Sequence, residues 1–166
     1  MRLPRLFKHW LTSPWAVRSA FPARSFAAIE QAIRTAERLH GGEIRFAVEA
    51  ALATPALLRR QSARERAVEL FSHLRIWDTE YNNGVLVYVL LADRAVEIVA
   101  DRGIHELVGA PAWQGMCQNM EDAFFMSHYR VGALQGIKAV AEALMLHFPP
   151  RNRRSDEQPF PALPSD

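Results

Sequence analysis

Several features are missing from this sequence, and each absence excludes a class of protein. Cys117 is the single cysteine, so no internal disulfide forms, which disfavours a cystine-rich secreted domain. The longest uninterrupted apolar run, residues 85–92, is far shorter than the ~20 residues of a transmembrane helix, and we expect no membrane span. The N-terminus lacks the continuous apolar core of a secretory signal. The expected location is therefore the cytoplasm, with the membrane surface as a further option.

Acidic residues are missing from residues 1–24, which carry five basic side chains. Residues 25–150 hold 12 basic and 15 acidic side chains and are therefore mildly acidic. Nucleic-acid-binding domains usually gather Lys and Arg on a folded face, so this balance predicts no nucleic-acid partner. Any attraction to anionic partners is expected in the N-terminal arm.

Most catalytic signatures are missing as well. The sequence has no Gly-rich phosphate loop, no GxSxG or HExxH motif, and no histidine pair at metal-ligand spacing. Cys117 is followed by Gln, Asn, Met, Glu, Asp and Ala, without the arginine that closes the phosphate loop of a cysteine phosphatase. Because free cysteines are usually buried, we expect Cys117 to be a packing residue and not a nucleophile.

The first clear hydrophobic pattern in the sequence lies in the N-terminal arm, residues 1–24. Apolar residues recur there at helical spacing, namely Leu3, Leu6, Phe7, Trp10 and Leu11. One interpretation is a basic amphipathic element, residues 1–22, in peripheral contact with an anionic membrane. The other, which we favour, is an arm that packs its apolar side on its own domain, because Pro4 and Pro14 shorten any helix.

Hydrophobic periodicity predicts alternating helices and strands from Ser25 onward. Ser25 is a suitable first cap, and Ser62 with Glu65 has the spacing of a capping box inside a helical segment of one or two pieces. The predicted helices cover residues 25–40, about 55–76, 113–126 and 134–148, and the predicted strands cover residues 43–50, 85–91 and 95–100.

The connections between the predicted strands determine their directions. A helix separates the first two strands, which predicts a right-handed βαβ unit over residues 43–91 with parallel strands. The turn around Asp93 is too short for a crossover, so the second and third strands are antiparallel neighbours. The predicted fold class is α/β: a three-layer α/β/α sandwich around a small mixed sheet, with the βαβ unit followed by the hairpin.

The same patterns divide the chain into three parts. Residues 1–24 form a basic amphipathic N-terminal arm, and residues 25–148 form one domain, large enough to fold without disulfides or metal. Residues 149–166 hold five of the ten prolines and form a proline-rich tail. We predict disorder in this tail, because proline donates no backbone hydrogen bond and the tail has little apolar surface.

Two polar segments flank the hairpin: the NNG segment (residues 82–84) and the DRG segment (residues 101–103). If Asp93 is the centre of the turn, position 85 lies opposite 101 and the two segments meet at one rim of the sheet. Ligands often bind in α/β proteins where loops gather at strand ends, so the rim is a candidate site. The other interpretation, which we favour for Asn82, Asn83, Gly84 and Gly103, is that these residues only form turns, since Asn and Gly tolerate positive φ.

The strand EIRFAVEA and the stretch NNGVLVYVLLADRAVEIVADRGI resemble the TPM domain, over about residues 25–148. That family is named after a thylakoid lumen protein, a photosystem repair protein and an acetylcholine-receptor modulator. The resemblance implies an α/β/α sandwich often attached to membrane or envelope proteins, acid phosphatase activity in some members, and divalent-metal binding in others. Members commonly have DNG before the second strand and GYG followed by Glu after the third. Here Asn82 replaces the Asp, Asp101 and Arg102 replace Gly and Tyr, and His105 stands near the Glu.

From these observations we predict a non-catalytic TPM-type binding or interaction module with a protein partner, associated with the maintenance of membrane or envelope proteins. The alternative is an acid phosphatase-like hydrolase that depends on a divalent cation, calcium or magnesium, with Asp101 as the best single metal ligand. The predicted ligand-binding residues are Asn82, Asn83, Asp101, Arg102 and His105, with Glu49 and Asp78 nearby.

Overall fold

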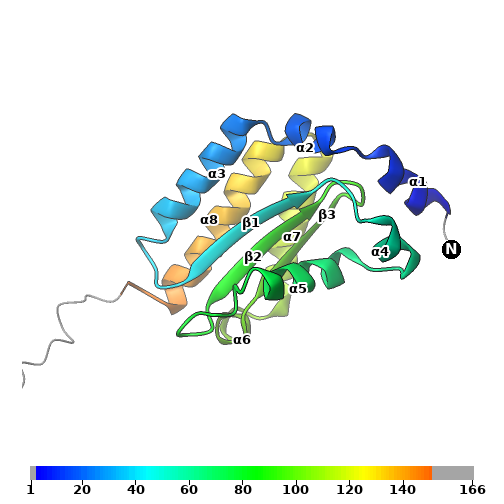
Figure 1. Ribbon diagram of the computed structural model, residues 1–166. Helices are drawn as coiled ribbons and strands as arrows, with labels where there is room; N and C mark the ends of the chain where they lie inside the picture. Colours follow the sequence, from blue (N-terminus) through cyan, green and yellow to red (C-terminus); the bar gives the residue numbers. More distant parts are fainter. Residues whose placement is uncertain (1–2, 151–166) are drawn as a thin grey trace, which may run out of the picture.

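The computed structural model describes residues 3–150, so the predicted disorder of the tail from residue 151 onward lies outside the described residues. Three strands form one sheet in the order β1-β2-β3, with β1 parallel to β2 and β2 antiparallel to β3. Helices cover both faces of the sheet (Figure 1), which confirms the predicted α/β sandwich around a mixed sheet. The strands are β1 (Glu43–Glu49), β2 (Gly84–Leu90) and β3 (Ala95–Ala100). The helices are α1 (Leu3–Leu11), α2 (Pro14–Ala20), α3 (Ala23–Ala36), α4 (Thr54–Leu58), α5 (Ala63–His73), α6 (Arg102–Val108), α7 (Ala110–Phe125) and α8 (Tyr129–His147).

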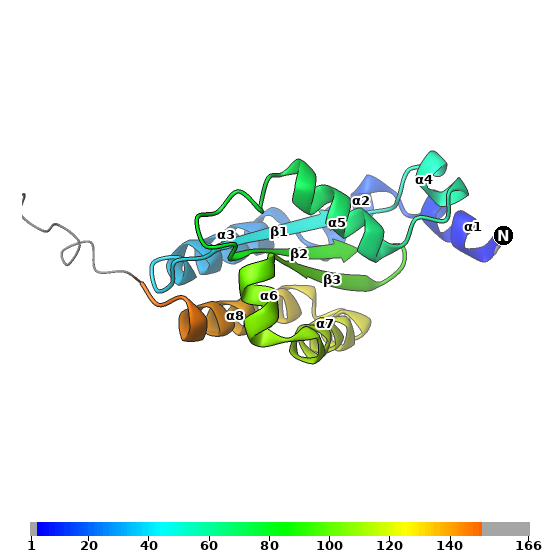
Figure 2. The same ribbon diagram turned by 90° about the horizontal axis from the view of Figure 1, so that it is seen from below.

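The central strand β2 is buried along its whole length, because its side chains alternate between two cores. Odd-numbered residues such as Val87 pack into the core shared with α3, α7 and α8. Even-numbered residues such as Tyr88 pack into the core shared with α4 and α5. Figure 2 shows α5 on one face of the sheet and α6, α7 and α8 on the other.

Some predicted boundaries are wrong by a few residues, for local reasons. The third helix begins at Ala23 and not at Ser25, because Pro22 takes the cap position and Ser25 is buried in the first turn. The hairpin register differs from the predicted one by one residue. Val85 pairs with Ala100 and not with residue 101, because the loop between the strands has four residues, 91–94, and no single central residue. The helical segment after β1 is in two pieces, and the Ser62–Glu65 capping box starts the second.

Helix α6 was not predicted, because it is short and follows β3 without a separating loop. Asp101 provides its N-cap: the Asp101 side chain accepts a hydrogen bond from the Arg102 backbone N–H. The DRG segment is therefore a strand-to-helix junction. This matters for the candidate site, because two of the three residues in that segment lie inside a helix.

Phe21 connects the N-terminal helices to the domain. Its side chain is almost fully buried, and its ring lies between 5.6 and 5.8 Å, centroid to centroid, from the rings of Phe26, Phe46, Phe124 and Tyr129. Aromatic pairs at such distances add to the stabilisation from burial alone. The end of α2 is thereby fixed beside the start of α8. The predicted boundaries at residues 24 and 148 stay predictions.

Candidate functional site

The NNG and DRG segments face one another at one rim of the sheet. This was predicted from the position of the turn at Asp93, although the observed register is shifted by one residue. The Asp101 N–H donates to the Gly84 carbonyl oxygen at 2.8 Å, and the Ile104 N–H donates to the Asn82 carbonyl oxygen at 3.2 Å. Both contacts are between backbone groups. The rim is therefore held together by the main chain of the two segments.

The glycines of both segments permit close approach of the preceding loop. A Cβ atom on Gly84 would collide with the carbonyl oxygen of Ile76, and one on Gly103 would lie 2.5 Å from the carbonyl oxygen of Tyr81. Any larger residue would have to displace backbone at these positions. The glycines thus have a structural role that requires no ligand.

The asparagines of the rim also serve the fold. Asn82 is exposed and adopts φ 51°, a conformation that Asn tolerates better than most residues. Asn83 is only 1% exposed; its Nδ2 donates to the Gly41 carbonyl oxygen at 3.1 Å, and its N–H donates to the Thr79 hydroxyl at 3.0 Å. Asn83 therefore ties the start of β2 to the loop before β1.

The remaining predicted site residues do not converge at the rim. Asp78 and Arg102 are exposed at its periphery, and His105 turns toward a hollow beside β3 that Trp113 and Cys117 also line. Glu49 pairs with Leu90 at the opposite end of the parallel β1–β2 ladder, whereas the rim lies beside Gly84. The prediction that Glu49 lies near the rim is wrong, because parallel strands place the end of β1 beside the end of β2.

Glu49 has its own partners at that opposite end. Arg66 Nη2 donates to Glu49 Oε1 at 2.6 Å, and the hydroxyl of the buried Tyr88 donates to Glu49 Oε2 at 2.6 Å. Burial alone would raise the pKa of Glu49, but the hydrogen bonds from Arg66 and Tyr88 outweigh it and lower the pKa. Glu49 is an ionised, fully engaged carboxylate that joins β1 to α5.

Asp101 is the rim residue that has a carboxylate oxygen without a hydrogen-bond partner. Its Oδ1 accepts the capping hydrogen bond, while its Oδ2 is buried and has no hydrogen-bond partner among the described residues. Within residues 3–150, no group of three or more His, Cys, Asp or Glu side chains is placed to hold a metal ion. The rim thus offers a cation one carboxylate oxygen from Asp101.

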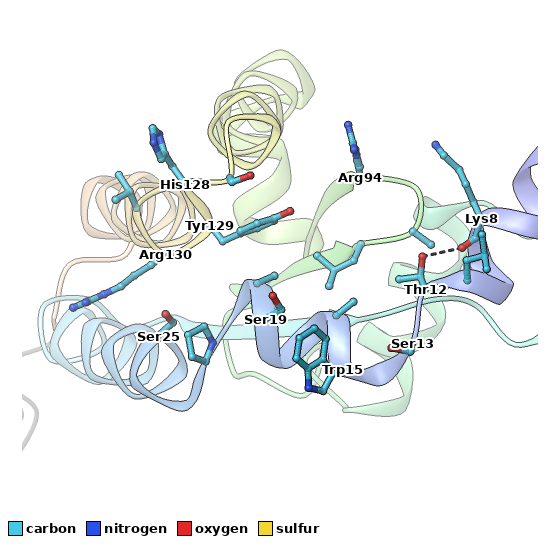
Figure 3. Close-up of a pocket in the computed structure, with 18 of the residues that line it drawn as sticks. Lys8, Thr12, Ser13, Trp15, Ser19, Ser25, Arg94, His128, Tyr129 and Arg130 are labelled. Carbon is cyan, nitrogen blue, oxygen red and sulfur yellow. Dashed lines mark hydrogen bonds between the residues drawn. The ribbon is translucent and has the colours of Figure 1, made fainter.

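A larger site lies at the other end of the sheet, where the β2–β3 turn meets the N-terminal helices and the α7–α8 loop (Figure 3). This cleft encloses about 950 Å³. Four basic side chains line it, contributed by α1, α3, the β2–β3 turn and α8: Lys8, Arg24, Arg94 and Arg130. No aspartate or glutamate belongs to its described lining.

The four basic side chains of the cleft differ in direction but share the lack of an acidic partner. Within residues 3–150, none of these four forms an ion pair with a carboxylate. Figure 3 shows Lys8 and Arg94 extending on the same side of the cleft, the Tyr129 hydroxyl pointing toward its centre, and Arg130 directed away over α3. Arg94 also stacks over the Phe125 ring, with its Cζ 5.9 Å from the ring centroid.

Backbone groups add to the positive character of the cleft. Helices α3 and α8 both begin at its wall, and neither start has a capping hydrogen bond from a side chain. The first N–H groups of a helix carry a partial positive charge and favour anions. The cleft can therefore hold an anionic group by cations, backbone N–H groups and the hydroxyls of Ser19, Ser25 and Tyr129.

Sequence reasoning missed this cleft, because Lys8, Arg24, Arg94 and Arg130 are scattered over the chain. One signal was present: the absence of acidic residues from residues 1–24. That signal indicated where anions would be attracted, but only the fold shows that the β2–β3 turn and the start of α8 complete the cleft.

No helix in the described part of the chain is both long and apolar enough to cross a membrane.

Comparison with known proteins gives a consistent assignment. A family model described as TPM domain matches residues 19–143. The NMR structure of the BA42 protein from the psychrophilic bacterium Bizionia argentinensis is 30% identical over 84% of this chain and 91% of that chain, with a TM-score of 0.69. The N-terminal domain of a protein from P. gingivalis, also solved by NMR, shares the fold at 15% identity, with a TM-score of 0.63 over 78% of this chain and 81% of that chain. No curated protein matches the chain.

Proposed function

The chain belongs to the TPM domain family, and from that premise we propose that it is a non-catalytic binding module that holds an anionic group in the cleft lined by Lys8, Arg24, Arg94 and Arg130. One observation carries the proposal: Lys8 and Arg94 extend on the same side of a cleft whose described lining also includes Arg24 and Arg130 and has no carboxylate. An association with the maintenance of membrane or envelope proteins, and a protein partner, are the parts of the proposal that rest on the family resemblance alone.

Electrostatics supports a ligand with phosphate or carboxylate groups. Like charges repel, so cations that share a cleft without acids are stabilised when an anion enters, and the effect is larger where walls exclude water. Arginine and backbone N–H groups form short, charge-assisted hydrogen bonds with such anions. Thr12 and Ser13 add further polar groups to the wall (Figure 3).

Titration with inorganic phosphate and with citrate, followed by backbone NMR shifts, tests this proposal. We expect the largest shifts at residues 91–94 and 127–131, because these segments line the cleft. Arg94→Gln should weaken binding by about tenfold, the equivalent of one charge-assisted hydrogen bond. Arg75→Gln, which removes the same charge from an exposed residue outside the cleft, is the matched control. Equal affinity of both variants, or shifts confined to the rim, would contradict the proposal.

A second candidate function is divalent-cation binding at the rim, favoured by the buried, unpartnered Oδ2 of Asp101. Carboxylate oxygens are the ligands that calcium and magnesium prefer. An acid phosphatase-like activity would depend on such an ion, so ion binding is tested first. Millimolar calcium or magnesium should shift the NMR signals of residues 101–105, and Asp101→Asn should abolish the shift; no response in the parent protein would eliminate this candidate.

A further inference from the structure

Helix α1 directs most of its apolar face toward solvent and not toward the domain. Its apolar residues Phe7, Trp10 and Leu11 are 64%, 78% and 69% exposed, whereas His9 on the opposite side is 3% exposed. Leu6 is the apolar residue of α1 that packs inward, against the core beneath α4 and α5. The prediction that the arm packs its apolar side on its own domain is therefore wrong for most of that side.

Polar contacts hold α1 in this orientation. Arg5 Nη2 donates to Asp93 Oδ2 at 2.7 Å and to the Gln61 carbonyl oxygen at 2.9 Å. The Leu52 N–H donates to His9 Nδ1 at 2.9 Å, so Nε2 carries the hydrogen that His9 donates to Asp93 Oδ1 at 2.9 Å. Rolling α1 to bury its apolar face would break these contacts and leave His9, Asp93 and the Leu52 N–H unpaired, which is costly for buried groups. The apolar face is held outward by the fold.

Helix α2 adds a further exposed apolar side chain, and both helices carry exposed positive charge. Trp15 is 72% exposed, and Lys8 and Arg18 are exposed on the same two helices. The sequence has no acidic residue before Glu30. Isolated exposed apolar residues are normal on a protein surface, but a group of Trp, Phe and Leu on a helix is characteristic of an interaction site.

We propose that Phe7, Trp10, Leu11 and Trp15 form a docking surface for an anionic phospholipid bilayer. Tryptophan and phenylalanine favour the boundary between headgroups and acyl chains, and adjacent Lys and Arg are attracted to anionic headgroups. The surrounding charge is what selects a membrane over a second copy of this chain, because two such basic surfaces would repel each other. The surface shares Leu11 and Trp15 with the lining of the cleft, but Phe7 and Trp10 do not line it, so changes at these two residues test this inference separately from the proposed function.

Flotation of the full chain with lipid vesicles tests the proposal. We expect binding to vesicles of phosphatidylcholine with phosphatidylglycerol, weak binding to phosphatidylcholine alone, and a loss of binding at high salt. The variant Phe7→Ser with Trp10→Ser should weaken binding by at least about a hundredfold, because two large apolar side chains no longer enter the bilayer. Its melting temperature should not fall, since both side chains are exposed.

The matched control is Trp77→Ser with Leu146→Ser, which removes two exposed apolar side chains outside α1 and α2. Equal flotation of the two double variants and the parent, or no flotation of the parent, would overturn the proposal. A concentration-dependent dimer that the Phe7 and Trp10 changes abolish would assign the surface to a second copy instead. Phosphate titration separates the two proposals: the Phe7 and Trp10 double variant should lose flotation and still bind phosphate in the cleft. A parent protein that floats with the vesicles but does not bind phosphate would count against the cleft alone.

Discussion

Arg5 of α1 and Asp93 of the β2–β3 turn are 88 positions apart in the sequence, yet they form a paired contact: Arg5 Nη2 lies 2.7 Å from Asp93 Oδ2, and Arg5 Nε lies 3.2 Å from Asp93 Oδ1. His9 donates to the same carboxylate. One aspartate in a turn thus fixes the orientation of the first helix. It also fixes one wall of the cleft, because α1 contributes Lys8 and Leu11 to the lining.

The variant Asp93→Ala should release α1 from the domain. Arg5 and His9 lose their shared acceptor, and the expected loss is about 1–3 kcal/mol of docking free energy, confined to the N-terminal helix. Hydrogen exchange of residues 5–11 is the measurement, and their protection should fall while that of β2 stays unchanged. Glu30→Gln, which breaks the exposed i,i+4 pair with Arg34, serves as the control with an effect within about 0.5 kcal/mol. Unchanged protection of α1 in Asp93→Ala would show that other contacts hold it.

Stability should fall in acid because of Asp93 and Glu49. Burial alone would raise the pKa of Asp93, but hydrogen bonds from Arg5 and His9 outweigh burial and lower it. The pKa of Glu49 is lowered in the same way by Arg66 and Tyr88. A folded-state pKa below the unfolded value contributes stability above the unfolded pKa, about 4, and that stability is lost as pH falls through the folded-state pKa.

Urea unfolding of the parent and of Glu49→Gln, measured from about pH 7 to about pH 3, checks this expectation. Glu49→Gln should be less stable than the parent at neutral pH, and its stability should decrease less steeply in acid, because glutamine does not titrate. Glu106→Gln, which replaces an exposed carboxylate on α6, is the matched control. The same acid slope in Glu49→Gln and in the parent would argue against Glu49 as a source of the pH dependence.

The fold could be predicted because its signals are local. The helical segment between the first two strands and the short turn at Asp93 indicated the strand directions, and Ser62 with Glu65 marked the start of α5. The rim segments were placed together for the same reason. A turn-forming role for both segments was one of the two interpretations from the sequence. The strict need for glycine at position 84 was not predictable, because the carbonyl oxygen that excludes a side chain there belongs to Ile76, outside the hairpin.

The orientation of α1 depends on tertiary contacts, and so does the formation of the cleft. Hydrophobic periodicity in the sequence does not indicate such contacts. Helical spacing identified an apolar face with Phe7 and Trp10, but spacing alone does not say whether such a face points inward. The contacts of Arg5 and His9 with Asp93 decide that point. The cleft likewise requires residues from four separate segments to meet.

The requirement for glycine at position 84 gives a stability prediction. Gly84→Ala should destabilise the protein by about 3 kcal/mol or more, because the new Cβ collides with the backbone oxygen of Ile76 and the backbone must move. Gly115→Ala is the matched substitution: apart from the adjoining residues and backbone of α7 itself, no atom lies within 4 Å of its added Cβ, and alanine favours the helix there by up to about 1 kcal/mol. Thermal unfolding of both variants should show shifts of opposite sign. A neutral Gly84→Ala would mean that the loop before β2 yields easily.

The reactivity of Cys117 tests whether it is a packing residue. Burial raises the pKa of its thiol to about 11, although a backbone hydrogen bond from Ile98 acts in the opposite direction. The thiolate is the reactive form, so at about pH 8 the native protein should contain about 200-fold less thiolate than a free cysteine with a pKa of about 8.5. The rate of reaction with a disulfide reagent, in buffer and after unfolding in urea, measures this difference. Cys117 is the single cysteine, so the signal needs no assignment and Cys117→Ser gives the blank.

A native rate within about tenfold of the unfolded rate would show that the thiol is accessible and ionises. Cys117 would then be a reactive residue and not a packing residue, beside Glu97 and His105 in the hollow next to β3.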